Sequence, residues 1–250
     1  MSITHNDILN EIEANGIFLS HDLLNESERE KLKNEFNFVE NDKIINISEL
    51  NELKKLSDTL YNFVKNPNIS KFLEDYLKDI PVCTSVHFTR CKLIRSINEK
   101  DEIDKGSVLG FHNDDKGKQI KINFLLNDLE KDTNGLDYAL KSHKLSLIDN
   151  LILFILQKFN FMSGWDKHFL NYLKNKIRKK KVNFLLSSEV LNKYEIRHVY
   201  GKKGLVYIFD TNGYHRQSYS AQKDSTPPRE LLTLYFLGKK KLHLINKKEL

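Results

Sequence analysis

After residue 80 the chain changes to a series of short segments rich in β-branched and aromatic residues, and this feature restricts the fold most strongly. Seven such runs follow one another: VCTSVHFTRCKLIRSI, KQIKINFLL, LDYAL, VNFLL, YEIRHVY, GLVYIFD and ELLTLYFLG. These residue types favour strands, and few of the runs are joined by segments that have a helical pattern. The sequence therefore predicts an antiparallel sandwich or barrel.

The first eighty residues have a helical pattern instead. Ile8 and Ile12 indicate a short amphipathic segment that Gly16 ends. Asn25 with Glu28 three residues later resembles a capping box at the start of a second helix. These residues predict a helical layer on one side of the strands.

Apolar side chains at three- and four-residue spacing predict a longer helix from about residue 49 to residue 66, and Pro67 should end it. The side chains that set this spacing are Leu50, Leu53, Leu56, Leu60 and Phe63. A further short helix should carry Phe72, Tyr76 and Leu77. A second helical region, an insertion, is expected at residues 144–181, within the strand-rich part of the chain.

We expect a single domain over residues 1–250, because no linker rich in Pro, Gly or Ser divides the chain. The formal charge of +6 is modest for this length and does not by itself indicate nucleic acid.

Cys83 and Cys91 are too few for a disulfide framework or a four-thiolate zinc site. With no signal-peptide pattern in MSITHNDILNEIE and no apolar stretch long enough to span a bilayer, we expect a cytoplasmic protein.

The segment LGFHNDDKGKQIKINFLLND places a histidine and two carboxylates just before a predicted buried strand. In an extended segment His112 and Asp114 project from the same face, whereas Asn113 points away. An imidazole and a carboxylate suit a divalent metal, and a second histidine would complete the facial triad of non-haem iron(II) oxygenases. The alternative is a solvated loop. We expect Asp115 to be either a solvated neighbour or a group that supports a metal ligand.

His215 is the best candidate for that second histidine. It follows the strand GLVYIFD and the turn pair Asn212-Gly213, so its side chain should be presented at the rim of the sandwich. The other histidines lie in helical segments or in plain strand-like or terminal context, and His143 is expected to hold a loop.

Five segments of the chain resemble the phytanoyl-CoA dioxygenase-like branch of the iron(II)/2-oxoglutarate oxygenases. These segments are NGIFLSHDLLNESEREKLKNEF, FHND, NDLEKDTNGLDYALKSHK, GLVYIFDTNGYHR and PRELLTLYF. The resemblance implies a double-stranded β-helix, or jelly roll, with a mainly β core, the helical N-terminal layer and the helical insertion. One departure is LKSH, where Pro-Gly-Ser-His is usual in the family.

The resemblance also implies roles for individual residues. His112, Asp114 and His215 would bind iron(II), and Arg229 would hold the distal carboxylate of 2-oxoglutarate, with Gln217 near the same carboxylate. An arginine suits this role because its planar guanidinium binds carboxylates in a bidentate manner. Arg216 is a rival for it, because the spacing from His215 to Arg229 is longer than usual. Asp114, where halogenating relatives have Gly or Ala, argues against halogenation.

The basic run Lys174–Lys181 lies at the end of the insertion. It could be a solvated helix face or a docking patch for a substrate with an anionic handle. Residues 144–181 could likewise be core or a lid over the site.

The resemblance predicts an iron(II)- and 2-oxoglutarate-dependent dioxygenase that uses O2 to hydroxylate a small organic or lipid-like substrate. Two alternatives stay open. One is a non-catalytic jelly-roll protein that binds a metal or ligand; the other is a basic nucleic-acid-binding domain, which would need aromatic side chains beside the lysine run. We expect neither a nucleic-acid partner nor a membrane span.

Overall fold

The computed structural model describes residues 3–36, 42–91, 111–114, 118–131, 135–144, 192–218 and 228–246. The predictions for Asp115, for the strand at VNFLL, for the insertion beyond residue 144 and for the basic run Lys174–Lys181 lie outside these residues. Among the helices of the described part, none is long and apolar enough to cross a membrane.

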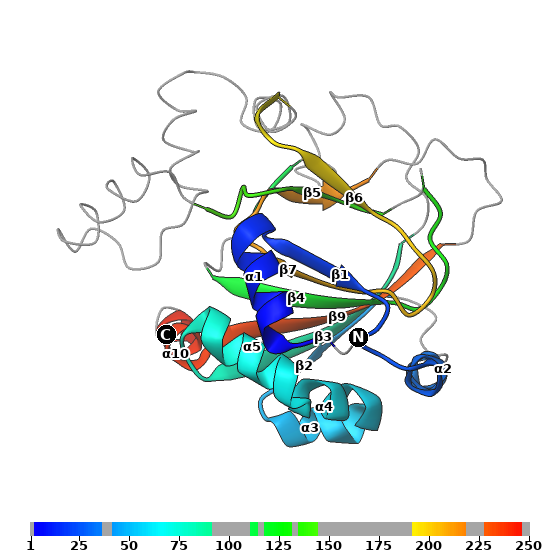
Figure 1. The fold of residues 1–250 in the computed structure, drawn as a ribbon. Helices are drawn as coiled ribbons and strands as arrows, with labels where there is room; N and C mark the ends of the chain where they lie inside the picture. Colours follow the sequence, from blue (N-terminus) through cyan, green and yellow to red (C-terminus); the bar gives the residue numbers. More distant parts are fainter. Residues whose placement is uncertain are drawn as a thin grey trace.

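Two antiparallel sheets form a sandwich, with the smaller sheet stacked over the larger one (Figure 1). The six-stranded sheet has the order β1 (Ile17–Ser20), β7 (Val206–Asp210), β4 (Gln119–Leu125), β9 (Arg229–Gly238), β3 (Pro81–Cys91) and β2 (Lys43–Asn46). The three-stranded sheet has the order β6 (Ile196–Val199), β5 (Leu136–Ala139) and β8 (His215–Gln217). Neighbours in the larger sheet are far apart in sequence, as in a double-stranded β-helix, so the predicted fold is confirmed.

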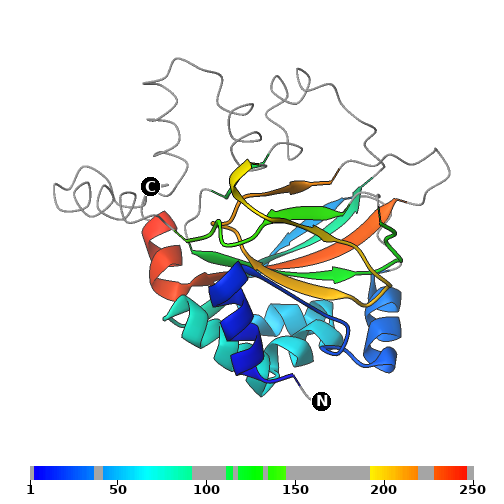
Figure 2. The same ribbon diagram turned by 45° about the horizontal axis from the view of Figure 1, so that its top comes forward.

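Helices cover the outer face of the larger sheet, which confirms the predicted helical layer (Figure 2). The helices are α1 (His5–Asn15), α2 (Glu26–Glu35), α3 (Leu50–Leu56), α4 (Asp58–Lys65), α5 (Pro67–Leu77) and the C-terminal α10 (Lys239–Asn246). The first eighty residues also supply β1 and β2, which form the two edges of the larger sheet. We did not predict α10. We also did not predict β1 or β2, because each strand is only four residues long and lies between helices.

The single helix predicted over residues 49–66 is wrong: the structure has two helices there. Ser57 has an extended backbone, and its hydroxyl accepts a hydrogen bond from the Leu60 amide at 3.0 Å, so it caps α4. Serine is a preferred N-cap, and this local bond competes with a continuous helix. Pro67 also begins a helix, α5, where Asn66 is the cap.

The local signals at the first two helices are confirmed. Gly16 ends α1 with a φ of 86°, a left-handed conformation that favours glycine. Asn25 and Glu28 form a capping box in which each side chain accepts a hydrogen bond from the other's amide. Both elements begin or end where the sequence indicates.

Alternating side chains give the larger sheet two different faces. The face toward the helices is apolar throughout its centre, with Ile120, Ile122, Phe124, Val206, Ile208, Leu232, Leu234 and Phe236 in one core cluster. The face toward the smaller sheet is mixed: Tyr207, Phe209 and Leu231 belong to a second apolar cluster that includes residues of β5. Lys121, Asn123 and Thr233 lie on the same face and line a cavity with them, so the outer core stabilises the fold and the inner face carries the candidate site.

Candidate metal centre

A cavity of about 360 Å³ lies on the inner face of the larger sheet. Its lining residues come from both sheets and include Asp42, Thr89, His112, Lys121, Asn123, Leu136, Tyr207, Phe209, His215, Arg216, Gln217, Arg229, Leu231, Thr233 and Tyr235. The cavity therefore contains both predicted histidines, both candidate arginines and Gln217. Asp114 lies beside it, paired with Lys121.

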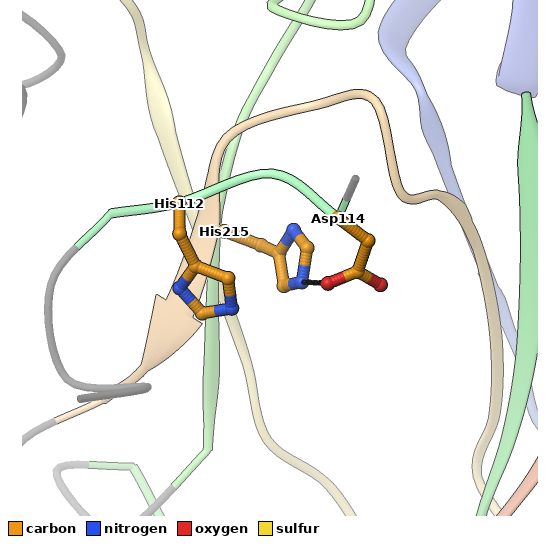
Figure 3. Close-up of side chains that lie close together, drawn as sticks. All are labelled: His112, Asp114 and His215. Atoms are coloured by element: carbon orange, nitrogen blue, oxygen red, sulfur yellow. Dashed lines mark ion pairs between the residues drawn. The ribbon is translucent and has the colours of Figure 1, made fainter. Parts of the chain in front are cut away.

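His112, Asp114 and His215 converge (Figure 3). One ligand atom from each lies within 4.8 Å of the other two, and the His215 Nε2 is 3.8 Å from the Asp114 Oδ1. The centroids of the two imidazole rings are 4.6 Å apart. The structure thus brings together the three residues that the sequence predicts as metal ligands.

Backbone hydrogen bonds fix this convergence. The amide and carbonyl of His112 pair with those of His215 at 3.0 and 2.8 Å, so residues 111–114 lie along the start of β8. The Asp114 amide donates to the Thr211 carbonyl at 3.0 Å, in the turn that follows β7. Hydrogen bonds therefore hold the segment with His112 and Asp114 against the turn after β7 and the start of β8.

The His215 ring is oriented for coordination through Nε2. Its Nδ1 lies 2.9 Å from the Gly213 carbonyl, which assigns the proton to Nδ1 and the lone pair to Nε2. The Nε2 is buried and has no hydrogen-bond partner within the described part of the chain. A buried acceptor nitrogen, in a ring that is oriented by a hydrogen bond at its other nitrogen, is typical of a metal ligand.

The protonation states also suit a metal. Burial, with the charges of His112 and Lys121, lowers the pKa of His215 to about 3, so the ring is neutral at neutral pH. Burial alone would raise the pKa of Asp114, but the nearby Lys121 and the two histidines outweigh burial and lower it. The neutral His215 imidazole and the Asp114 carboxylate suit a divalent ion such as iron(II).

Lys121 is a site residue that the sequence analysis missed. Its ammonium lies 2.7 Å from the Asp114 Oδ2, which leaves Oδ1 facing His215. It also lies 5.0 Å from the centroid of the Tyr235 ring. The available signal was a lysine inside the predicted buried strand QIKINF, where a charged side chain needs a partner.

The two candidate arginines have different partners. Arg229, at the start of β9, is buried and donates to the Gly135 carbonyl at 2.9 Å. Arg216 donates through Nε to the buried carboxylate of Asp137 at 2.9 Å and lies over the Phe111 ring. Gln217 is buried in the cavity wall, and its Nε2 makes no hydrogen bond within the described residues.

The LKSH loop, residues 140–143, forms a turn although it has Lys141 where the family pattern has glycine. Lys141 has a φ of 63°, the left-handed conformation that glycine adopts more readily. The buried Ser142 hydroxyl accepts from the Tyr214 amide at 2.7 Å and donates to the Ala139 carbonyl at 2.6 Å. His143 lies 3.2 Å from the Glu13 carbonyl, outside the triad, so its predicted role in a loop is confirmed.

No family model matches the chain, and no curated protein matches it. Solved structures do resemble it. EctD from S. alaskensis, solved with 2-oxoglutarate and 5-hydroxyectoine, has a TM-score of 0.59 at 12% identity, over 93% of this chain and 76% of EctD. HygX from Streptomyces hygroscopicus, solved with iron bound, has a TM-score of 0.57 at 11% identity, over 96% of this chain and 88% of HygX.

The non-heme α-ketoglutarate-dependent carbocyclase SnoK from nogalamycin biosynthesis has a TM-score of 0.56 at 12% identity. The match covers 98% of this chain and 93% of SnoK. At these identities the likeness establishes the fold alone: the chain has a double-stranded β-helix. Its place in the phytanoyl-CoA dioxygenase-like branch stays a prediction.

Proposed function

We propose that the chain is an iron(II)- and 2-oxoglutarate-dependent dioxygenase that hydroxylates a small organic or lipid-like substrate. The observation that carries the proposal is the convergence of His112, Asp114 and His215 at the wall of a cavity in this fold. Iron(II), 2-oxoglutarate and O2 together supply the oxidising chemistry at such a centre. The side chains bind and orient these groups.

Each residue of the triad has a distinct task in this proposal. His215 presents a fixed lone pair, because the Gly213 carbonyl holds its Nδ1. Asp114 presents one oxygen to the metal while Lys121 holds the other. His112, Asp114 and His215 would together hold the metal and would leave it accessible to the co-substrate and O2.

Arg229 is our candidate for the distal carboxylate of 2-oxoglutarate. Arg229 is buried in the cavity wall, and its rival, Arg216, forms an ion pair with the buried Asp137 carboxylate. Gln217 lies in the same cavity with a buried amide nitrogen that could donate to the carboxylate. A guanidinium and an amide placed together suit a carboxylate oxygen pair.

The cavity wall supports a small substrate with apolar character. Its volume is near the lower end of the range for small-molecule sites, about 300 to 1,000 Å³. Tyr207, Phe209, Leu231 and Tyr235 supply aromatic and aliphatic surface. Two of the similar proteins also concern small molecules: EctD was solved with 5-hydroxyectoine, and SnoK comes from nogalamycin biosynthesis.

The test of the proposal is the release of succinate from 2-oxoglutarate by protein supplied with iron(II) and O2. We expect release by the wild-type protein, faster when an accepted substrate is added from a panel of small metabolites and acyl derivatives. Asp114→Ala should release none. If metal and 2-oxoglutarate bind normally but no member of the panel gives succinate, the non-catalytic binding protein is the better description.

A further inference from the structure

Asp210 is a buried carboxylate that the triad does not use. It ends β7, and only 2% of its surface is exposed. The Tyr76 hydroxyl, from α5, donates to its Oδ2 at 2.6 Å. The backbone amide of Asn212 donates to the Asp210 Oδ1 at 2.9 Å. The carboxylate thus joins the helical layer to the first residues after β7.

The turn at residues 211–214 is the part of the backbone that orients the triad. The Thr211 carbonyl accepts from the Asp114 amide, and the Gly213 carbonyl lies against the His215 Nδ1. The turn itself is closed on Asp210, whose carbonyl accepts from the Gly213 amide at 3.1 Å. A shift of this turn would therefore move two of the three metal ligands.

A second tyrosine supports the same turn from the opposite sheet. The Tyr138 hydroxyl, from β5, donates to the Asp210 carbonyl at 2.9 Å. A Cβ added to Gly213 would lie 1.9 Å from that hydroxyl oxygen, so only glycine fits there. The turn is therefore closely packed between the two sheets. The Asp210 side chain links it to α5.

We propose that Asp210 and Tyr76 are positioning residues that hold the turn at residues 211–214 in the shape that aims His215 and Asp114 at one metal ion. An aspartate that accepts from the amide two residues ahead is a known stabiliser of turns, and a phenol-to-carboxylate hydrogen bond is of the strong, charge-assisted kind. The inference rests on the proposed metal site and adds a contribution of the helical layer to metal affinity.

Tyr76→Phe tests the inference, because it removes one hydroxyl and keeps the ring that packs in the core. The readouts are cobalt(II) affinity by equilibrium dialysis and hydrogen exchange of the Asn212 and Gly213 amides in the metal-free protein. We expect cobalt(II) affinity to fall roughly 10- to 100-fold, as for other groups that orient metal ligands. Both amides should exchange faster than in the wild-type protein.

Thr59→Val is the matched control. Thr59 is buried in α4 and donates to Glu35 at 3.2 Å, so the variant also loses a buried hydrogen bond in the helical layer. We expect it to lower the melting temperature while cobalt(II) affinity and the exchange of the two amides stay at wild-type values. Asp210→Asn should resemble Tyr76→Phe, but the inference is judged on the tyrosine variant.

Two results would overturn the inference in distinguishable ways. Unchanged cobalt(II) affinity and amide exchange in Tyr76→Phe, with normal binding by the wild-type protein, would show that the bond only stabilises the fold. If the wild-type protein bound no cobalt(II), the proposed metal site would fail, and the role in metal affinity would fail with it.

Discussion

Arg229 and Arg216 both line the cavity, but a buried carboxylate neutralises Arg216 through a 2.9 Å ion pair. If Arg229 holds the distal carboxylate of 2-oxoglutarate, Arg229→Ala should weaken its binding by about 2 to 5 kcal/mol. Arg229→Lys should recover only part of the loss, because an ammonium lacks the planar fork. The measurement is an anaerobic titration of the iron(II)-loaded variants with 2-oxoglutarate.

Arg216→Ala is the matching experiment. It should leave 2-oxoglutarate affinity nearly unchanged and lower the stability of the fold, because Asp137 loses a charged partner in a buried position. The reverse pattern, with Arg216→Ala impairing the titration and Arg229→Ala silent, would assign the carboxylate to Arg216.

Lys121 adds a positive charge directly beside the triad. Lys121→Met keeps the apolar stem and removes that charge. We expect a loss of about 1 to 3 kcal/mol in the binding of 2-oxoglutarate, a dianion, to the metal-loaded protein. The same titration measures it. A loss of metal affinity with unchanged 2-oxoglutarate affinity would show instead that Lys121 only orients Asp114.

At the residue scale, local signals made His112, Asp114 and His215 candidate ligands, and the family resemblance made them a predicted triad. His112 and Asp114 alternate in an extended segment, and His215 follows a strand and a turn. Asp210 and Tyr76 were not predicted as partners, because they are 134 positions apart and meet only when a helix packs on the sheet. Contacts of this kind carry no local signal.

At the scale of elements, the LKSH loop offers a direct test of backbone conformation. Lys141 has a φ of 63°, which costs most residues other than glycine about 1 kcal/mol. Lys141→Gly should therefore raise the free energy of unfolding by up to about 1 kcal/mol, measured by urea denaturation. Lys144→Gly, three residues later and without a positive φ, should give no gain. Equal effects of both variants would contradict this conformation.

Helix boundaries show what element-scale signals can and cannot predict. The capping box at Asn25 and the glycine stop at Gly16 were predicted correctly, because each works through hydrogen bonds or φ preferences within a few residues. The break at Ser57 was missed, because the spacing of apolar residues continues across it. β1 and β2 were missed because pairing with β7 and β3 makes these short segments strands.

At the scale of the whole molecule, a large apolar cluster between the helices and the larger sheet stabilises the fold on the face away from the metal site. A second cluster, between the two sheets, borders the cavity through Leu136, Tyr207, Phe209 and Leu231. We therefore expect removal of metal with a chelator to leave the protein folded, with circular dichroism unchanged. Adding metal at 100 times its dissociation constant should raise stability by about 2.7 kcal/mol. Unfolding by the chelator would show a structural role for the metal.

An antiparallel sandwich or barrel was predictable as a class of fold, since strand-like runs with few intervening helices favour antiparallel sheets. The double-stranded β-helix itself was implied only by the family resemblance. The pairing of β3 with β9 and of β4 with both β7 and β9 was not, because it joins segments far apart in sequence. The same pairing brings Lys121 and Arg229 into one cavity. The site therefore follows from the topology as much as from the ligand motif.

The central claim is that His112, Asp114 and His215 bind one iron(II) ion that then binds 2-oxoglutarate. The most direct measurement is an anaerobic titration of metal-free protein with iron(II) and then with 2-oxoglutarate, followed by the metal-to-ligand charge-transfer absorption. We predict a band that saturates at one iron and one 2-oxoglutarate per chain and is absent in His215→Ala. No band in the folded wild-type protein, or an equal band in His215→Ala, would contradict the account.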